Sequence, residues 1–430
     1  MSEPVAKTTP IIVAASEKPT LMPRFDVVVV GSGALGASAA FHLARAGRSV
    51  ALLDKAEIAS QTSPRAAGLS GQLRRNIVMS TLARRSVEKL LAFADETGEP
   101  MELYQPGSMN IARTERHRVQ LEKAVAWGQS LGFPIEALSP EEACERMPFL
   151  RPTGVLSATH LKTDVFLEPA QVPRGYAAAA AKLGAELHPH TRVDGFVAEG
   201  AKVRRVLTDR GEFEADAVVD AAGAWARRLA QLAGSEAPMV PMRHQLMVTE
   251  PIDGVGNDQP IVRVIDVNVY VRPDRGGLML GGYERDPRPL DLNQTPVDFR
   301  VEDLELDLSV LRRLAATVGD QFPVFVDAPI REHRGGLPTM TIDGEHIVGP
   351  APGLDNLYLL AGCNVGGLSI SPALGEEIAA WVVRGAPSFD LSRMSPARFP
   401  QGLSASELLA GATERYAHYY SPPPVLPGAY

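Results

Sequence analysis

The stretch FDVVVVGSGALGASAAFHLARAGRSVALLDK, residues 25–55, holds an apolar run, a cluster of glycines, an alanine-rich segment, a second apolar run and an acid. The β-branched run at residues 25–30 predicts a strand that is buried on both faces of a parallel sheet. The small residues after it predict a helix that Gly47 ends, and residues 48–53 predict a second strand that closes at Asp54. This order predicts an α/β fold with a Rossmann-type βαβ unit, which binds a dinucleotide.

The glycines of this unit have separate physical roles. Gly31 permits the tight turn after the first strand, and Gly33 lets the backbone approach a pyrophosphate. Gly36 allows the helix to pack closely on the sheet, while Asp54 is expected to accept hydrogen bonds from both ribose hydroxyls. A glycine turn that binds no ligand is the alternative, which the order of the elements disfavours. The fingerprint itself serves both nicotinamide and flavin dinucleotides.

Three further segments bear on the choice between these cofactors. The loop SQTSPRAAGLSGQLRRN, residues 60–76, surrounds Arg65 with small and hydroxyl residues, and its amides suit a pyrophosphate or a ring system. An ordinary polar loop is the alternative for this segment. A strand at residues 215–220 runs into Gly223 and a helix, which would return the chain to the same sheet. Near the end, a predicted strand at 357–360 precedes a glycine-rich turn and a helix over 372–383.

Bulk composition limits the class of partner. The chain has 430 residues, 45% of them hydrophobic, and a formal net charge of -8. Mixed charges without a basic stripe argue against nucleic acid and membrane surfaces, so small molecules are the expected partners. Cys144 and Cys363 lack metal-type or disulfide spacing, which predicts no metal and a reducing, cytoplasmic setting. Residues 1–23 hold only one short apolar run and are expected to form a flexible extension.

Five motifs in order carry a family resemblance. They are AAGLSGQLR after the second predicted strand, RHQLMVTEP at Arg243, YVRPDRGGLMLGGYE from Tyr270, GLPTMTIDGEHIVGP from Gly336 and GAPSFDLSRMSPARF from Gly385. With them, the chain resembles the D-amino-acid oxidase (DAO) superfamily of FAD-dependent oxidoreductases from about residue 24 to its tail. Within that superfamily it is similar to the flavin portion of dimethylglycine and sarcosine dehydrogenases.

The resemblance implies a DAO/glutathione-reductase-like fold, with a discontinuous Rossmann-type FAD-binding domain and a substrate domain that contains a mixed β-sheet. Strand-length apolar segments between glycine, proline and aspartate support that sheet. The implied division is 24–95, 152–235 and 336–399 for the FAD-binding domain, 96–151 and 236–335 for the substrate domain, and 400–430 for a C-terminal helix and proline-rich tail. Ser404 and Glu407 form a capping-box pair that begins the helix.

The resemblance also implies a set of cofactor-binding residues. They are Gly31, Gly33, Gly36, Asp54, Lys55, Arg65, Ala66, Ala67, Gly68, Leu69, Val193, Ala222, Gly223, Gly362, Asn364, Val365, Gly366, Gly367 and Leu368. Arg65 stands where covalently flavinylated relatives carry the histidine that bonds the ring, and arginine cannot form that bond. The loop near Gly336 lacks the cysteine that monomeric sarcosine oxidases use. We therefore expect a non-covalently bound FAD, with Arg65 paired to phosphate.

Two residues are expected on the substrate side of the flavin. By motif, His244 and Tyr270 correspond to a histidine and a tyrosine that line this side in dimethylglycine oxidases. Purely structural roles in a half-buried sheet are the alternative for both. We interpret these two as the residues that carry the chemistry.

Two substitutions relative to the family narrow the expected chemistry. Pro338 replaces the arginine that grips the substrate carboxylate in glycine and D-amino-acid oxidases. Arg272, Arg331 and Arg334 are the candidates to compensate for this loss, and an ordinary structural role is the alternative for each of them. Met279 replaces a lysine that helps oxygen react in monomeric sarcosine oxidases, because a cation stabilises developing superoxide charge. We therefore expect molecular oxygen to be a poor acceptor.

The function expected from this resemblance is FAD-dependent amine oxidation. Hydride would leave the carbon next to a secondary or tertiary amine, as in an N-methyl amino acid, and the imine would hydrolyse. The residues after Phe399 are too few for the folate domain of the dehydrogenases, so free formaldehyde is the expected product. A glycine oxidase-type enzyme and a catalytically silent flavoprotein subunit are the alternatives. The sequence assigns neither the electron acceptor nor the oligomeric state.

Overall fold

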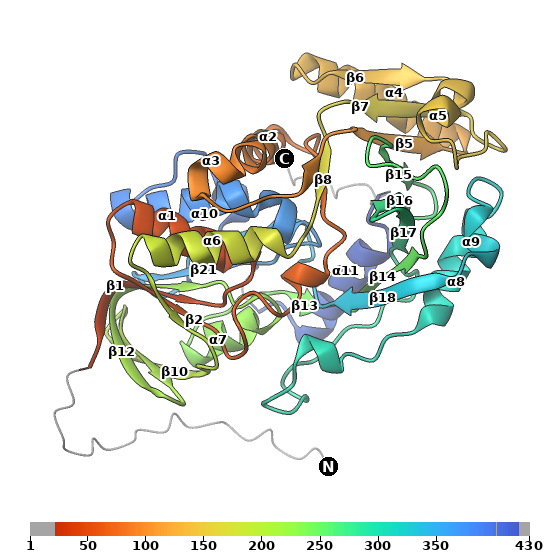
Figure 1. Cartoon of the computed structure of the whole chain (residues 1–430). Helices are drawn as coiled ribbons and strands as arrows, with labels where there is room; N and C mark the ends of the chain where they lie inside the picture. Colours follow the sequence, from red (N-terminus) through yellow and green to blue (C-terminus); the bar gives the residue numbers. More distant parts are fainter. Residues whose placement is uncertain (1–21, 401, 421–430) are drawn as a thin grey trace, which may run out of the picture.

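A computed structural model describes residues 22–400 and 402–420, and Figure 1 shows its course. The elements form two halves, each built around a large sheet. The predicted N-terminal extension, residues 1–23, lies outside the described residues except for its last two positions. The predicted proline-rich tail lies outside them as well, because the description ends at Tyr420.

The first sheet has the predicted βαβ unit at its centre. Its central strands run parallel in the order β21, β12, β1, β2, β9. Their bounds are β1 Arg24–Val30, β2 Val50–Leu53, β9 Glu186–His188, β12 Gly211–Asp220 and β21 Leu357–Ala361. Antiparallel strands extend the sheet, namely β10 Val193–Glu199, β11 Lys202–Thr208 and β20 Ile347–Pro350. The four strands predicted for this sheet are confirmed, although β2 begins two residues later than expected, and so is the α/β fold class.

Helices cover the first sheet, and α1 lies innermost among them. It packs between α6 and α10, and its alanines Ala37, Ala39 and Ala40 are fully buried. Such small side chains let the helix backbone approach the strands closely. The helices on this face are α1 Ala34–Arg45, α2 Ile77–Leu91, α3 Phe93–Thr97, α6 Gln171–Lys182 and α10 Gly367–Arg384, while α7 Ala226–Leu232 covers the other face (Figure 1).

Helix α10 begins at Gly367, five residues before the predicted start at Pro372, and that prediction is wrong. A proline inside a helix lacks the N–H that would bond to the carbonyl four residues earlier. Here that carbonyl belongs to Leu368, and the Ser371 hydroxyl donates to it at 2.9 Å. The helix therefore continues through Pro372 with its backbone acceptor satisfied, and its amino end moves closer to the preceding strand.

The second sheet is mixed, as expected. Its order is β18, β14, β17, β16, β15, β5, β7, β6, and only the β15–β5 pair is parallel. The bounds are β5 Ser108–Ala112, β6 Ile135–Leu138, β7 Ser157–Leu161, β14 His244–Thr249, β15 Ile261–Val264, β16 Val269–Asp274, β17 Gly277–Gly282 and β18 Ile330–Gly336. β7 lies in this sheet, so the segment 152–235 assigned to the FAD-binding domain begins in the other half of the molecule.

Helices cover the second sheet on its outer face and at one end. The outer face carries α5 Pro140–Arg146, α8 Leu308–Thr317 and α9 Val324–Asp327, and the end near β6 carries α4 Glu115–Ser130. Small sheets join the two halves, formed by β3 Leu69–Ser70, β4 Leu103–Tyr104 and β8 Val165–Leu167, and by β13 Val240–Pro241 and β19 Thr339–Met340. The face of the second sheet that these helices leave uncovered therefore faces the first half of the molecule.

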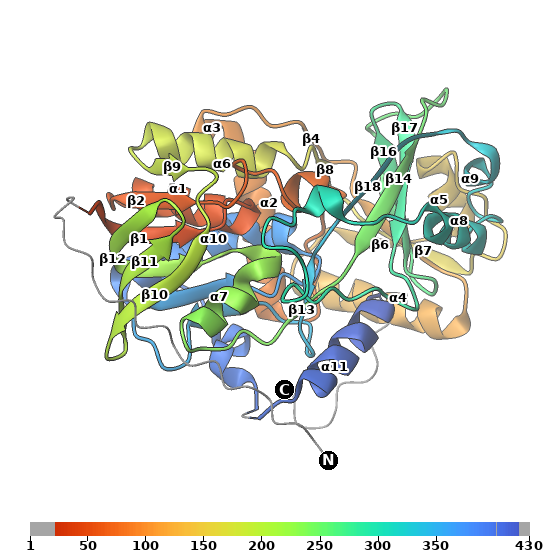
Figure 2. The same ribbon diagram turned by 90° about the horizontal axis from the view of Figure 1, so that it is seen from below.

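The predicted C-terminal helix is confirmed as α11 Ala405–Ala417. Ser404 and Glu407 form its capping box, with reciprocal bonds between each side chain and the other residue's backbone N–H. Figure 2 shows α11 below β13, between the two halves of the molecule. The helix contacts β13 and β19, so the end of the described chain lies at the junction of the two halves.

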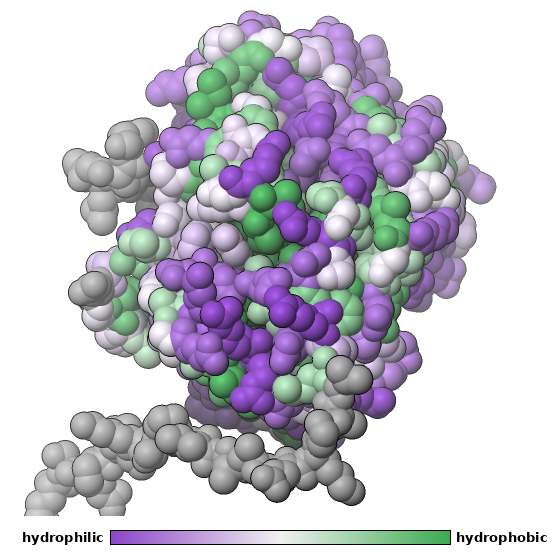
Figure 3. Space-filling model, turned by 90° about the vertical axis from the view of Figure 1, so that its left-hand side faces the viewer, coloured by the Kyte–Doolittle hydropathy of each residue, from purple (hydrophilic) through white to green (hydrophobic). Residues whose placement is uncertain are grey.

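One face of the molecule is mostly polar. On the face seen in Figure 3, hydrophilic side chains predominate and the apolar ones lie in small groups between them. Within residues 22–400 and 402–420, no helix has the length and hydropathy needed to cross a membrane. In the same residues, no three His, Cys, Asp or Glu side chains gather as metal ligands do, and both cysteines are free thiols.

Asp220 closes β12 with a carboxyl group that is completely buried. Its Oδ1 accepts a hydrogen bond from the Ala222 N–H at 3.1 Å, whereas Oδ2 has no partner among the described residues. Burial raises the pKa of this carboxyl to about 8, whereas an exposed aspartate has a pKa of about 3.9. The folded protein therefore holds a proton that the unfolded chain releases between about pH 4 and pH 8.

We expect Asp220→Asn to stabilise the protein increasingly as pH rises through this window. The wild-type carboxyl loses roughly 1.4 kcal/mol of stability per pH unit there, whereas the amide does not titrate. Thermal melts at about pH 5 and about pH 8 measure the effect, and the Tm difference between variant and wild type should be larger at the higher pH. Equal differences at the two pH values would mean that Asp220 is already ionised in the folded protein.

Candidate functional site

A cavity of about 710 Å³ lies between the two halves of the molecule. Its walls come from the β1–α1 turn, the loop after β2, the inner face of the second sheet, the loop before α10 and the last described residues. Its size lies within the range of small-molecule sites. All the predicted cofactor and substrate residues line it except Gly36 and Gly362, which lie behind its wall.

The β1–α1 turn brings backbone amides to the cavity through two close contacts. Gly31 has φ +99°, and a Cβ there would lie 2.5 Å from the carbonyl oxygen of Ala221. A Cβ on Gly36 would lie 1.8 Å from the Gly31 oxygen, so only glycine lets α1 begin this close to the strand. The Ser63 hydroxyl accepts from the Ala34 N–H at 2.9 Å, and the first turn of α1 opens on the cavity. Such a helix start suits a phosphate.

Asp54 lines the cavity at the end of β2, with most of its acceptor capacity already in use. Its Oδ2 accepts from the Ser32 N–H at 2.8 Å and from the Ser32 hydroxyl at 2.6 Å, and its Oδ1 accepts from the Ala56 N–H at 2.9 Å. A carboxylate offers about four acceptor positions. About one remains, which is fewer than the two ribose hydroxyls expected from the sequence. Burial raises the pKa of Asp54, and these bonds oppose the shift.

Lys55 and Arg65 turn toward the protein rather than into open space. Lys55 donates to the Phe299 carbonyl at 2.7 Å and lies 4.1 Å from the centre of the Trp225 ring. Burial lowers its pKa to about 8. Arg65 donates to the carbonyls of Ser60 and Gln61 and lies 4.0 Å from a Glu302 oxygen. Arg65 therefore braces its own loop, and the expected pairing with phosphate requires these contacts to change.

The loop before α10 holds two strained residues side by side. Asn364 has φ +43° and Val365 has φ +62°, a backbone region that is unfavourable for a β-branched side chain. The Asn364 side chain accepts from the Thr341 N–H at 3.0 Å and donates to the carbonyls of Gly362 and Glu345 at 2.7 and 3.0 Å. Residues in such conformations cluster at ligand sites, and both of these residues line the cavity.

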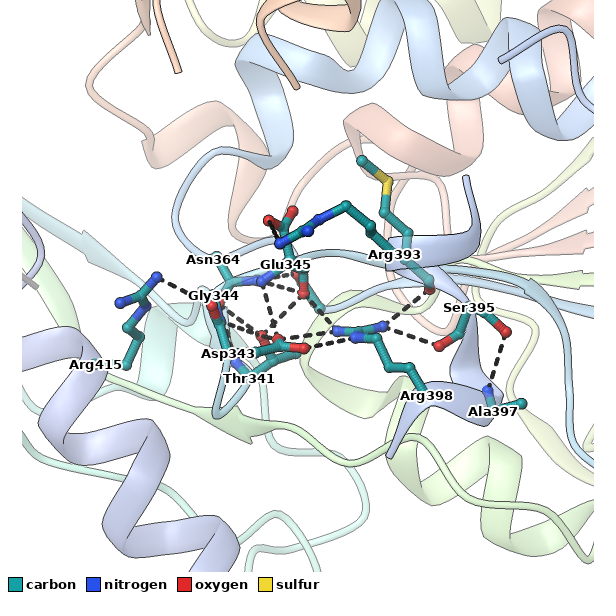
Figure 4. Close-up of polar contacts among 12 residues, drawn as sticks. Thr341, Asp343, Gly344, Glu345, Asn364, Arg393, Ser395, Ala397, Arg398 and Arg415 are labelled. Atoms are coloured by element: carbon teal, nitrogen blue, oxygen red, sulfur yellow. Dashed lines mark hydrogen bonds and ion pairs between the residues drawn. The ribbon is translucent and has the colours of Figure 1, made fainter. Parts of the chain in front are cut away.

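Figure 4 shows how a neighbouring turn, residues 341–345, fixes that loop. Arg398 donates to both carboxylate oxygens of Asp343, at 2.6 and 3.1 Å, and to the Glu345 carbonyl at 2.9 Å. Arg415 of α11 donates to the Asp343 carbonyl at 3.0 Å. Arg398 and Arg415 therefore hold the turn from two sides. The turn itself fixes the Asn364 side chain through Thr341 and Glu345.

Among the remaining predicted cofactor residues, Gly68 shows the same close backbone approach. Gly68 has φ +70°, and a Cβ there would lie 2.1 Å from the Leu167 carbonyl oxygen. The residues on either side of it, Ala67 and Leu69, line the cavity as well. Gly362, by contrast, packs against Ile347 and Thr341 and supports the loop from behind. Val193, Ala222 and Gly223 line the end of the cavity near the first sheet.

His244 and Tyr270 are brought together on the inner face of the second sheet. Tyr416 of α11 donates its hydroxyl proton to the Arg243 carbonyl at 3.1 Å, so its oxygen accepts from His244 Nδ1–H at 2.7 Å. Burial lowers the pKa of His244 to about 4, so its Nε2 is an acceptor for the Tyr270 hydroxyl at 3.1 Å. The free lone pairs of the Tyr270 oxygen are left for a donor in the cavity.

Aromatic residues that the sequence did not single out complete this wall. Tyr283, which directly follows β17, stacks on Tyr419 with ring centres 4.1 Å apart and planes 8° apart. The Tyr419 hydroxyl donates to the Asn364 carbonyl at 3.1 Å, and Tyr420 lines the cavity next to it. The segment ERYAHYY contains both residues, but its pattern gives no sign of where α11 docks.

The arginines proposed to replace the missing clamp do not line the cavity. Arg272 pairs with Asp274 at 3.1 Å and donates to the Ala67 carbonyl at 2.7 Å. Arg331 and Arg334 bond to the carbonyl of Asp274 and to the carboxylate of Glu332, respectively. Those side chains stabilise the sheet and its neighbouring loop. Met279 is fully buried in the apolar cluster that contains Tyr270, and the expected poor reaction with oxygen stays a prediction.

Comparison with known proteins gives three informative matches. The sequence profile of the family described as "DAO: FAD dependent oxidoreductase" matches residues 26–381. Human mitochondrial dimethylglycine dehydrogenase is 29% identical over 406 residues, which is 91% of this chain and 46% of that protein. The "4-methylaminobutanoate oxidase (formaldehyde-forming)" of Paenarthrobacter nicotinovorans is 30% identical over 373 residues, 86% of this chain and 45% of that protein. This chain thus spans about half the length of these relatives.

A solved structure agrees with the fold. Glycine oxidase from Geobacillus kaustophilus is similar with a TM-score of 0.78 and 27% identity, covering 88% of this chain and 100% of that one. The residues of the cavity also fit FAD, because Gly31 and Gly33 bring backbone without a side chain to its wall, and Gly366 and Gly367 of the loop before α10 line it as well. The βαβ half would hold the dinucleotide, and the inner face of the second sheet would lie over the ring system.

We expect Asp54→Ala to weaken FAD binding by about ten- to a hundredfold. One hydrogen bond from a ribose hydroxyl to this charged carboxylate contributes roughly 1.5 to 3 kcal/mol. Fluorescence titration of the apoprotein with FAD measures the change. Asp216→Ala is the matched control, because Asp216 pairs with Arg24 at 2.9 Å on the exposed surface, outside the cavity. Equal affinities in the two variants would remove Asp54 from the FAD site.

Proposed function

Because this chain belongs to the DAO family of FAD-dependent oxidoreductases, we propose that it oxidises an amine at the carbon next to a secondary or tertiary nitrogen. Bound FAD supplies the hydride acceptor for this reaction. The oxidised amine is released as an imine or iminium that water hydrolyses. An N-methyl amino acid is the proposed kind of substrate, and the names of the two relatives support it.

The observation that carries the proposal is the bonded pair of His244 and Tyr270 on the cavity wall. Because Tyr270 donates to His244, its oxygen faces the cavity as an acceptor and suits an N–H donor. The two side chains hold the amine in one orientation, which is what hydride transfer from the adjacent carbon requires. Among the described residues, neither side chain of the pair bonds to a carboxylate that could act as a strong base.

Neither residue of this pair is suited to take up the proton of a charged substrate amine. Burial lowers the pKa of His244 to about 4, so the imidazole is neutral above that pH and is a poor base. Burial raises the pKa of Tyr270 above its ordinary value, so its hydroxyl keeps its proton. The amine must therefore bind in its neutral form, or lose its proton to solvent, before it reacts.

A glycine oxidase-type activity is the second candidate. The similarity to the solved glycine oxidase supports it, whereas Pro338 at the position of the family's carboxylate clamp argues against it. A screen of primary and N-methylated amino acids, scored by anaerobic bleaching of the flavin, separates the two. A flavin that no amine bleaches would favour a silent subunit.

We expect Tyr270→Phe to slow anaerobic flavin reduction by about ten- to a hundredfold while FAD stays bound. Loss of the hydroxyl removes the acceptor that orients the amine. Tyr358→Phe is the control, because Tyr358 lies on β21 outside the cavity and should reduce at the wild-type rate. In the wild type, the rate between about pH 6 and pH 8 should follow the ionisation of the substrate amine and show no His244 titration. A wild-type rate in Tyr270→Phe would assign the residue a structural role.

We expect oxidation of an N-methyl substrate to release free formaldehyde in proportion to the amine consumed. The methyl carbon loses hydride, and water adds to the resulting iminium to give formaldehyde and the demethylated amine. Turnover with an artificial electron acceptor, followed by assays for formaldehyde and methylamine, measures this. Methylamine without formaldehyde would place oxidation on the larger substituent. A rate that depends on tetrahydrofolate would contradict simple hydrolysis.

A further inference from the structure

A chain of hydrogen bonds runs from Tyr270 on the cavity wall to a backbone carbonyl behind it, by way of Tyr416 on α11. The Tyr270 oxygen lies 3.1 Å from His244 Nε2, and His244 Nδ1 lies 2.7 Å from the Tyr416 oxygen. The Tyr416 oxygen lies 3.1 Å from the carbonyl oxygen of Arg243. A hydroxyl and a neutral imidazole can each donate and accept, whereas a carbonyl only accepts. The direction of the whole chain is therefore set at the carbonyl.

Two arrangements of the protons agree with these distances, because a neutral imidazole carries one proton. In the first, the Tyr416 hydroxyl donates to the Arg243 carbonyl, and every group of the chain has a partner. In the second, that hydroxyl donates to His244 Nδ1, and the carbonyl is left without a donor, since no other described residue donates to it. Arg243 is 5% exposed, and a buried acceptor without a donor is costly. The first arrangement is therefore favoured.

The two arrangements give the cavity opposite chemistry. In the first, Tyr270 donates to His244, and its oxygen presents only lone pairs to an amine N–H. In the second, His244 Nε2–H donates to Tyr270, and the Tyr270 proton points into the cavity, where it bonds to the lone pair of the amine nitrogen. That lone pair forms the C=N bond as hydride leaves the adjacent carbon. A bond that must break before the transition state slows the reaction, so only the first arrangement suits the proposed chemistry.

The docking of α11 holds Tyr416 at the end of this chain. The carbonyl of Ala417 accepts from Asn268 Nδ2 at 3.1 Å, and the Tyr420 N–H donates to Asn268 Oδ1 at 2.9 Å. Asn268 directly precedes β16, the strand that carries Tyr270. One amide side chain thus fixes the end of α11 to the strand of Tyr270, and Tyr416 keeps its place relative to that strand.

We propose that Tyr416 is a positioning residue of the active site. Its hydroxyl selects the tautomer of His244 that carries the proton on Nδ1, and this tautomer makes the Tyr270 oxygen an acceptor. The proposal rests on the proposed amine oxidation, which is the reaction that uses this acceptor. Tyr416 does not itself line the cavity, so it acts on the substrate only through His244 and Tyr270.

The first test reads the tautomer of His244 in FAD-loaded protein labelled with nitrogen-15 histidine. Nitrogen NMR separates protonated from unprotonated ring nitrogens, and the His244 signals are those that disappear in His244→Asn or His244→Gln. The wild type should show a protonated Nδ1. Tyr416→Phe keeps the ring, which packs edge-on against Tyr283 with centres 5.2 Å apart, and should move more than about half of the population to protonated Nε2. Protonated Nε2 in the wild type, or an unchanged tautomer in Tyr416→Phe, would overturn the proposal.

The second test measures anaerobic flavin reduction by two secondary amines, sarcosine and 4-methylaminobutanoate. Tyr416→Phe should lower the limiting rate of the faster amine by about ten- to a hundredfold and leave FAD bound. Combining it with Tyr270→Phe should slow the reaction by no more than about threefold beyond the slower single variant, because both changes remove the same acceptor. Tyr176→Phe is the matched control, since Tyr176 is a fully buried tyrosine of α6 outside the cavity and should react at the wild-type rate.

The outcomes separate this proposal from the function on which it rests. If neither amine bleaches the flavin but the tautomer changes in Tyr416→Phe, the proposed amine oxidation fails and the control of His244 by Tyr416 stands. If an amine reduces the flavin of Tyr416→Phe at the wild-type rate, amine oxidation stands and the positioning role is wrong. Losses that multiply in the double variant would also contradict a shared acceptor.

Discussion

Helix α1 meets the end of β1 with no space for a side chain between them, and the rest of the structure depends on that contact. The missing Cβ of Gly36 is what lets the first turn of the helix lie against the Gly31 carbonyl. Gly31 in turn lies against the Ala221 carbonyl, so β1, β12 and α1 meet at one point. Because α6 and α10 pack on α1, the position of this contact also sets where the loop before α10 lies. A larger residue at Gly36 would therefore disturb every wall of the cavity on the dinucleotide side.

The features that could be predicted from the sequence are those with a local pattern. The β-branched run before Gly31 and the strand ending at Asp220 were recognisable because neighbouring residues encode them. The beginning of α10 was not, because it depends on the Ser371 hydroxyl replacing one backbone donor. The environment of Asp54 was not predictable either. Its bonds to Ser32 form only when two strands of the sheet lie side by side, and they change what the carboxylate has left to offer.

The substrate half of the cavity was less accessible to sequence reasoning, for a geometric reason. His244 and Tyr270 were found by motif, but their donor and acceptor roles follow from Tyr416, which lies 172 positions from His244. The arginines that the sequence suggested as substitutes for the missing clamp carry the right charge, but Arg272 and Arg334 are held in ion pairs with Asp274 and Glu332.

The strand order of the first sheet has a consequence for how the chain is made. β1 and β2 pair locally, but the other neighbour of β1 is β12, and Val28 pairs with Val218 about 190 positions later. At the usual speed of translation, β1 waits about 10 to 40 s after synthesis for that partner. During this interval, one edge of an apolar, β-branched strand is unpaired, which is the condition that favours association between nascent chains. Slowing translation between β2 and β12 would lengthen that exposure without altering a single contact of the finished protein.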